Sequence, residues 1–287
     1  MSQDQPLQST SQTDASGADS HDQKQPVMKV QDLHKRFGRN HVLRGLTLAF
    51  NPGETTVVMG PSGCGKSVML KHLIGLLHPD SGEVYFDQTR IDQLKESRLG
   101  DIRRRIGFLF QQGALFDSMS VGENVGFPLR EHTDATAEER RTRVERMLHM
   151  VGVPGTHDVD PATLSGGQRK RVALARAIIL EPDIILYDEP TTGLDPIRSD
   201  IIGELIRRLQ NALQLTSIVV THDIQLSFRI ADRMVLLHEG QVRMTGTPEE
   251  FRTTDDIEVR RFLEGRATVD ELAGLEPNHQ SAEVELT

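Results

Sequence analysis

Short runs of consecutive apolar residues alternate along the chain with longer segments in which apolar residues recur every three or four positions. The short runs predict strands that are buried on both faces, at residues 54–59, 184–187 and 217–221. The longer segments predict helices at residues 67–77, 165–180 and 201–214, and a helix-rich region from about 97 to 150. Strands that alternate with helices in this way predict an α/β fold around a parallel sheet.

The two ends of the chain differ from its middle. Residues 1–26 are rich in Ser, Gln and Asp and contain no apolar run, which predicts a disordered acidic tail rather than a secretory signal. Residues 266–287 are expected to form a second acidic extension, and residues 27–265 one folded unit. No window contains the roughly 18 uninterrupted apolar residues that a membrane-spanning helix needs.

The composition fits a soluble globular protein, because 37% of the 287 residues are hydrophobic and 26% are charged. The formal net charge of −9 comes mostly from the two tails, which are expected to be solvated. The middle of the chain has no cluster of Lys and Arg of the kind that binds nucleic acid. Cys64 is the only cysteine, so the chain has no internal disulfide, and a reducing cytosol is the simplest location.

A glycine-rich segment follows the first predicted strand and leads directly into a predicted helix. It consists of Gly60, Pro61, Ser62, Gly63, Cys64, Gly65, Lys66 and Ser67, which matches the phosphate-binding P-loop pattern G-x-x-x-x-G-K-[ST]. Its backbone N–H groups and the positive end of the following helix dipole would face phosphate oxygens. We expect Lys66 to contact the β- and γ-phosphates of ATP and Ser67 to bind Mg²⁺. The alternative is a glycine-rich turn that holds Lys and Ser by chance, but the flanking strand and helix favour the P-loop.

Two acidic residues, Asp188 and Glu189, follow the apolar strand at 184–187. In open α/β sheets, ligands bind beyond the carboxyl ends of the strands. We therefore expect Asp188 to hold Mg²⁺, often through water, and Glu189 to polarise the attacking water as a general base. The alternative is a solvated turn before Pro190, which the P-loop upstream makes less favourable.

The run Leu164, Ser165, Gly166, Gly167 and Gln168 lies at the start of a predicted helix. A serine, two glycines and a helix N-terminus form a second anion site. This run resembles the signature motif of ABC transporter ATPases, which few other P-loop proteins carry. The resemblance implies a head-to-tail homodimer, in which the signature of one subunit closes over the ATP held by the P-loop of the other. The alternative is an ordinary N-capped helix.

Other positions resemble further motifs of the same family. Gln111 after Phe110 resembles the Q-loop, which senses Mg²⁺ and γ-phosphate, although Gln112 is a second candidate. Asp195 resembles the D-loop at the subunit interface, and His222 the switch histidine that contacts γ-phosphate. Phe37 lies where the family stacks an aromatic ring on adenine; the alternative for it is a place in the core.

The resemblance covers residues 28–265 and implies the fold of the family. That fold is α/β, a P-loop NTPase with a Rossmann-like core, an antiparallel β subdomain and a helical subdomain at about residues 99–164. Cys64 is expected to have no chemical role. If its thiol is accessible, the helix N-terminus and Lys66 should make it more reactive than a free cysteine.

The segment from Gln112 to Phe116 and the segment from Glu123 to Thr133 are similar to the Mla/Mce-type phospholipid transport ATPases of Gram-negative envelopes. This narrower resemblance implies phospholipid as the transported substrate and a location at the cytoplasmic face of the inner membrane. It also implies a polytopic permease, a lipid-binding MCE protein and a STAS-domain protein as partners. In that family, the C-terminal extension can wrap around the neighbouring ATPase subunit.

Two alternatives remain open from the sequence. The first is an ABC transporter ATPase for another solute, such as an amino acid or a metal complex. Only residues 113–133 distinguish a phospholipid transport ATPase from such a protein. The second is a soluble ABC protein outside transport, which would usually carry two cassettes or a long coiled-coil insertion. The direction of transport does not follow from motifs that importers and exporters share.

Overall fold

The computed structural model describes residues 25–266, and the two predicted acidic tails lie almost entirely outside these residues. The central feature is a six-stranded sheet in the order β10-β9-β3-β8-β7-β6. Its strands are β3 (Thr55–Met59), β6 (Ile106–Leu109), β7 (Ile184–Asp188), β8 (Thr216–Val220), β9 (Arg233–His238) and β10 (Gln241–Gly246). All neighbouring pairs are parallel except β9 and β10, which are antiparallel.

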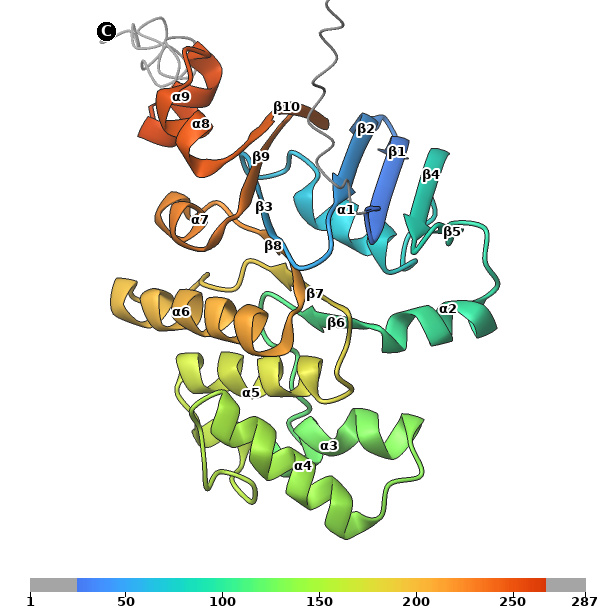
Figure 1. The fold of residues 1–287 in the computed structure, drawn as a ribbon, viewed down its shortest axis with the longest axis vertical. Helices are drawn as coiled ribbons and strands as arrows, with labels where there is room; N and C mark the ends of the chain where they lie inside the picture. Colours follow the sequence, from blue (N-terminus) through green and yellow to red (C-terminus); the bar gives the residue numbers. More distant parts are fainter. Residues whose placement is uncertain (1–24, 267–287) are drawn as a thin grey trace, which may run out of the picture.

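A second sheet of four antiparallel strands lies against the first, in the order β2-β1-β4-β5. Its strands are β1 (Met28–Phe37), β2 (Asn40–Phe50), β4 (Ser81–Phe86) and β5 (Thr89–Arg90). Figure 1 shows this sheet beside helix α1, with β9 and β10 at the same end of the molecule. The antiparallel subdomain that the family resemblance implied is thus present.

Helices cover the six-stranded sheet and extend away from it. They are α1 (Lys66–Leu73), α2 (Glu96–Arg104), α3 (Val121–His132), α4 (Ala137–Met150), α5 (Gly166–Ile178), α6 (Pro196–Leu213), α7 (Ile224–Ile230), α8 (Pro248–Thr253) and α9 (Ile257–Glu264), with a 3-10 turn at Pro161–Thr163. Figure 1 shows α3, α4 and α5 grouped at the end of the molecule opposite β10. No helix among residues 25–266 is long and apolar enough to cross a bilayer.

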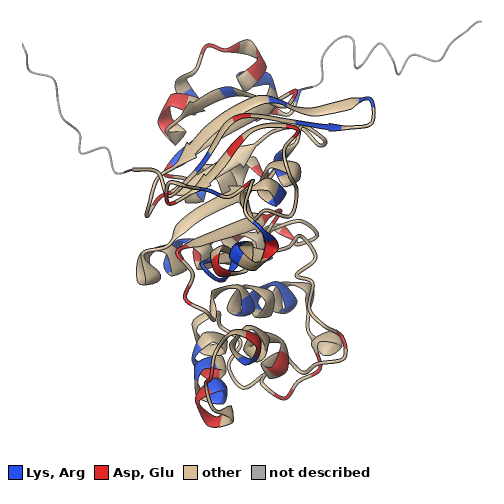
Figure 2. Ribbon diagram, turned by 90° about the vertical axis from the view of Figure 1, so that its right-hand side faces the viewer, with Lys and Arg blue, Asp and Glu red and all other residues tan. Residues whose placement is uncertain are grey.

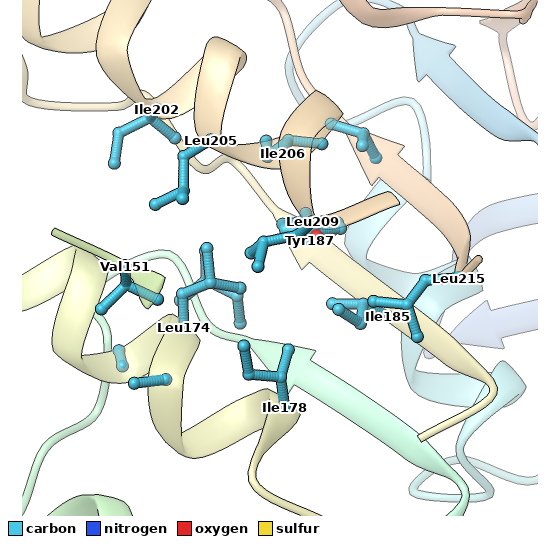
Figure 3. Packing of buried hydrophobic residues seen from close by; sticks show 14 of the residues in the cluster. Val151, Leu174, Ile178, Ile185, Tyr187, Ile202, Leu205, Ile206, Leu209 and Leu215 are labelled. Atoms are coloured by element: carbon cyan, nitrogen blue, oxygen red, sulfur yellow. The ribbon is translucent and has the colours of Figure 1, made fainter. Parts of the chain in front are cut away.

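Strand β7 shows how the sheet separates two hydrophobic cores. Ile184 and Leu186 point into the core on the side of the four-stranded sheet, whereas Ile185 and Tyr187 point into the core under α3 to α6. Figure 3 shows the second core, in which Ile185 and Tyr187 meet side chains of α5 and α6. Each fully buried Ile or Leu side chain stabilises the fold by about 1.5–3 kcal/mol, so β7 is firmly anchored just before its acidic end.

The predicted central elements are confirmed, with shifts at their ends. Helix α6 begins at Pro196 rather than at residue 201, because the Asp195 side chain accepts a hydrogen bond from Arg198 N and caps it. The region predicted as helix-rich contains strand β6, and so does the range 99–164 expected for the helical subdomain. Strand β6 pairs with β7 in the central sheet. Figure 2 shows basic and acidic residues interspersed, with no extended basic face in this view.

Candidate functional site

The loop between β3 and α1 curls tightly, and two of its glycines are fixed by their surroundings. Gly60 has φ 152°, and a Cβ there would lie 2.3 Å from the carbonyl oxygen of Leu237. Gly65 has φ 106°, and a Cβ there would lie 2.6 Å from Cδ2 of Leu43. Backbone conformation and close packing therefore both demand glycine at these positions.

The side chains at the end of this loop face inward, toward the loop and β7. The Lys66 ammonium is nearly buried and donates to the carbonyl oxygens of Gly60 at 2.7 Å and Pro61 at 3.0 Å. Ser67 Oγ donates to Asp188 Oδ1 at 2.8 Å. The structure therefore brings together the P-loop and the end of β7, as the sequence predicted.

Asp188 lies half-buried at the end of β7. Burial raises the pKa of its carboxyl group, the nearby Glu189 carboxylate adds to this, and the hydrogen bond from Ser67 opposes it. A hydroxyl and a carboxylate side by side are hard oxygen ligands of the type that Mg²⁺ takes. The residues present thus fit a Mg²⁺ ion.

Glu189 is held in place by two neighbouring segments, one at the end of β8 and one in the turn that follows Glu189 itself. Its backbone has φ 51°, a left-handed conformation that costs a non-glycine residue on the order of 1 kcal/mol. Its N–H donates to the carbonyl oxygen of Val220 in β8 at 2.9 Å. Its Oε2 lies 2.8 Å from His222 Nδ1 and accepts a hydrogen bond from Thr192 Oγ1 at 3.2 Å. The structure therefore joins Glu189 and His222, which the sequence had placed at the ends of two different strands.

The run Leu164–Gln168 forms the N-terminus of α5. Ser165 is the N-cap and accepts from Gln168 N at 3.3 Å, while Gln168 Oε1 accepts from Ser165 N at 2.9 Å. Gly166 and Gly167 form the first turn, and Leu164 is buried in the core. Within residues 25–266, no hydrogen bond joins this run to the P-loop. One chain therefore presents two separate helix N-termini of the kind that can bind anions.

The remaining predicted residues lie in three different places. Gln111 is exposed at the end of β6, and its carbonyl oxygen accepts from Lys170 Nζ at 3.2 Å. Asp195 caps α6, as described above. Phe37 is 47% exposed at the end of β1, and the Lys35 ammonium lies 5.7 Å from its ring centroid. The alternative of a core position for Phe37 is wrong.

Comparison with known proteins establishes the family. The family model described as ABC transporter matches residues 43–192, which is more than half of the chain. This chain belongs to the ABC transporter ATPases. As a member of that family, the ABC ATPase binds and hydrolyses ATP, and the predicted fold class is confirmed.

Individual relatives of the ABC ATPase agree with the family assignment. The intermembrane phospholipid transport system ATP-binding protein MlaF of Haemophilus influenzae is 42% identical over 243 residues, which cover 85% of this chain and 92% of that protein. The probable ribonucleotide transport ATP-binding protein mkl of Mycobacterium leprae is 42% identical over 240 residues, which cover 84% of this chain and 69% of that protein. A solved dimeric ATP-binding cassette in a post-hydrolysis state with ADP and Pi has a TM-score of 0.72 and 36% identity, covering 77% of this chain and 98% of its own.

The environment of Cys64 in the ABC ATPase differs from the environment that the sequence suggested. The side chain is 8% exposed and packs with the core beside the four-stranded sheet. Burial raises the pKa of the Cys64 thiol, although the Lys66 charge works in the opposite direction. The accessible thiol that enhanced reactivity requires is therefore absent, because burial outweighs the helix N-terminus and the neighbouring cation.

Sequence reasoning missed Lys170, which lies on the buried face of α5. Its Nζ donates to the carbonyl oxygens of Gln111 and Glu189, each at 3.2 Å. The signal was available, because Lys170 follows Gly167 by three residues and precedes Leu174 by four, which places it on the apolar stripe of the helix. A lysine at such a position is unusual and calls for partners.

An apolar cavity of about 620 Å³ opens beside Phe110, the residue before Gln111. Phe110 and Phe116, both more than 40% exposed, line it together with Phe127. Arg176 stacks on the Phe116 ring at 5.6 Å and also borders the cavity. An exposed group of large apolar side chains is typical of surfaces that bind a protein, a membrane or a ligand.

Proposed function

We propose that this ABC ATPase energises phospholipid transport in a bacterial envelope system of the Mla/Mce type. The observation that carries the proposal is the 42% identity to the MlaF protein of Haemophilus influenzae, which the alignment covers almost end to end. The segments from Gln112 to Phe116 and from Glu123 to Thr133 support the same conclusion from the sequence.

The geometry of the P-loop supports a role for each of its residues. The backbone N–H groups of Gly60 to Ser67 and the N-terminus of α1 bind the phosphates of ATP. Lys66 exchanges its contacts with loop carbonyls for the β- and γ-phosphate oxygens. Ser67, Asp188 and Gln111 would hold Mg²⁺, which would supply neutralisation of the phosphate charge when bound.

Glu189 and His222 act on the attacking water. Glu189 is the general base, because contacts with His222, Thr192 and Thr221 fix its carboxylate at the end of β7. His222 is mostly exposed, so its ring can contact the γ-phosphate while Nδ1 keeps the Glu189 carboxylate in place. Phe37, exposed and bearing a cation over its ring, stacks on adenine.

A second copy of the chain completes the site. The run Leu164 to Gln168 is a preformed anion site that is separate from the P-loop of its own chain. In a head-to-tail homodimer this run closes over ATP bound to the other subunit, and Asp195 lies at the interface. The solved dimeric cassette to which this chain is similar supports such an arrangement.

The membrane partner is a polytopic permease, and the cavity lined by Phe110, Phe116 and Phe127 is its docking site on the ATPase. This places the chain at the cytoplasmic face of the inner membrane as a peripheral subunit. An MCE lipid-binding protein and a STAS-domain protein complete the complex that the resemblance implies. A phospholipid is then the transported substrate.

A ribonucleotide is a second candidate for the transported solute, because the relative from Mycobacterium leprae carries that name. The experiment that separates the two uses the complex purified in detergent through this subunit and reconstituted into vesicles. We expect phospholipid to co-purify and a fluorescent phospholipid to exchange between vesicles only when ATP is hydrolysed, while added ribonucleoside monophosphates, which cannot be hydrolysed as fuel, have no effect. ATP-dependent ribonucleotide uptake without lipid exchange would contradict the proposal.

A further inference from the structure

Lys170 joins three segments of the ABC ATPase through a single ammonium group. It lies on α5, the helix that begins with the signature run. Its Nζ donates to the carbonyl oxygen of Gln111, 59 residues away in the loop after β6, and to that of Glu189 at the end of β7. The helix with the second anion site, the loop beside the apolar cavity and the proposed base therefore meet at one atom.

The burial of Lys170 shows that these contacts are specific. The residue is only 7% exposed, and a buried ammonium is unfavourable unless hydrogen bonds replace its hydration. Burial lowers the pKa of Lys170, and the charge of Glu189 works in the opposite direction. An uncharged side chain of similar length, such as Met, would pack in the same space without this cost. The position thus favours a residue that can donate hydrogen bonds.

The contact with Glu189 involves the main chain and not the carboxylate. Among the described residues, no ion pair joins Lys170 to the Glu189 side chain, whose Oε2 faces His222 instead. The Glu189 backbone is left-handed at φ 51°, and such a conformation persists only where neighbours fix it. Its N–H donates to the carbonyl oxygen of Val220 in β8, and its own carbonyl oxygen accepts from Lys170 Nζ at 3.2 Å and from Thr192 N at 3.3 Å.

We propose that Lys170 is a positioning residue for ATP hydrolysis, which fixes the direction of the Glu189 side chain and ties it to the Gln111 loop. The inference rests on the proposed role of Glu189 as the base. Among residues 25–266, no hydrogen bond joins Lys170 to the P-loop, so its loss should act on turnover and not on ATP binding. A displaced base lowers the rate steeply, because proton transfer requires hydrogen-bond distance.

The test compares Lys170→Met with Arg171→Met in the assembled transporter. Arg171 is the matched control, because it also donates to a carbonyl oxygen from α5, that of Gly152 at 2.8 Å, but on the exposed side of the helix. We expect K170M to lower kcat at least about tenfold with KM for ATP within about twofold of the original. R171M should keep both values. An unchanged kcat in K170M, or an equal loss in R171M, would overturn the proposal.

A second variant, Lys170→Gln, covers the case in which K170M does not fold. The Gln amide is shorter than the lysine side chain and reaches one carbonyl oxygen at most, so we expect a kcat between those of the original protein and K170M. An unchanged kcat in K170Q, with K170M unfolded, would show that bridging the two carbonyls is not required. Glu189→Gln, measured alongside, separates a failure of the base assignment from a failure of the Lys170 proposal. Retained turnover in E189Q would refute the assignment of Glu189 as the base. An inactive E189Q with an active K170M would refute only the role of Lys170.

Discussion

The Nδ1 atom of His222 lies 2.8 Å from Oε2 of Glu189, which joins the segments that follow β8 and β7. The Glu189 side chain is 11% exposed, whereas that of His222 is 61% exposed. The pair therefore connects a sheltered carboxylate to an imidazole that is open to solvent. In the proposed mechanism, this is the connection between the γ-phosphate and the base.

Replacing His222 with Ala should lower kcat by about 100-fold, because the imidazole both orients the base and contacts the γ-phosphate. ATP affinity of the isolated subunit should stay within about twofold, since the P-loop supplies most of the phosphate contacts. The control is His149→Ala, on the exposed face of α4 and far along the chain from the site. Steady-state ATPase assays and nucleotide titrations measure both quantities. Full turnover in H222A would refute this role of the histidine.

Gly166→Ala tests whether the signature run acts across a subunit interface. A Cβ at Gly166 would meet only Leu194 Cδ2, at 3.8 Å, so the substitution fits within the subunit. We expect an unchanged thermal midpoint and intact ATP binding to the isolated subunit, but hydrolysis at high subunit concentration should fall at least about tenfold. Gly100→Ala is the control, because a Cβ there meets nothing within 4 Å. If G166A abolished ATP binding to the monomer, the interface role would be wrong.

Cys64 should react slowly with maleimide in the folded protein. It is buried, and the raised pKa of its thiol leaves less thiolate at neutral pH than a free cysteine has. We expect labelling at pH 7 to be at least about tenfold slower than in the denatured chain. Since the folded pKa is raised, the rate should begin to climb at a higher pH in the folded protein than in the denatured one. Equal rates in both states would show that the thiol is accessible.

Hydrolysis by the isolated subunit should depend on its concentration. One chain carries one P-loop and one signature run, and no hydrogen bond joins them within residues 25–266. A dimer held together by nucleotide is then required, and its population grows with protein concentration. We expect the rate per subunit to rise with concentration in a dilution series at saturating ATP. A constant rate per subunit down to high dilution would mean that the monomer is sufficient.

Much of the site could be predicted because its parts are local in sequence. The P-loop, the acidic pair after β7 and the signature run each combine a residue pattern with a strand end or a helix start. The four-stranded sheet could not be predicted from periodicity, because bulges in β1 between Val30 and Leu33 interrupt the alternation. Strand β6 was missed because it has only four residues and includes Gly107.

The bridge made by Lys170 could not be predicted for a different reason. Helical periodicity places the residue on the buried side of α5, but its partners are main-chain oxygens of Gln111 and Glu189. A main-chain oxygen has no sequence signature, since every residue carries one. Whether the Cys64 thiol is accessible could not be predicted either, because its burial depends on packing with the core beside the four-stranded sheet and not on the loop itself.

The turnover of Glu189→Gln tests the central claim most directly. The amide keeps the size of the side chain but removes the basicity that activates water. The control is Glu138→Gln, in the first turn of α4 on the exposed surface. We expect E189Q to bind ATP as the original protein does and to hydrolyse it at least about 100-fold more slowly, while E138Q keeps full turnover. ATP hydrolysis by E189Q at close to the original rate would contradict the account.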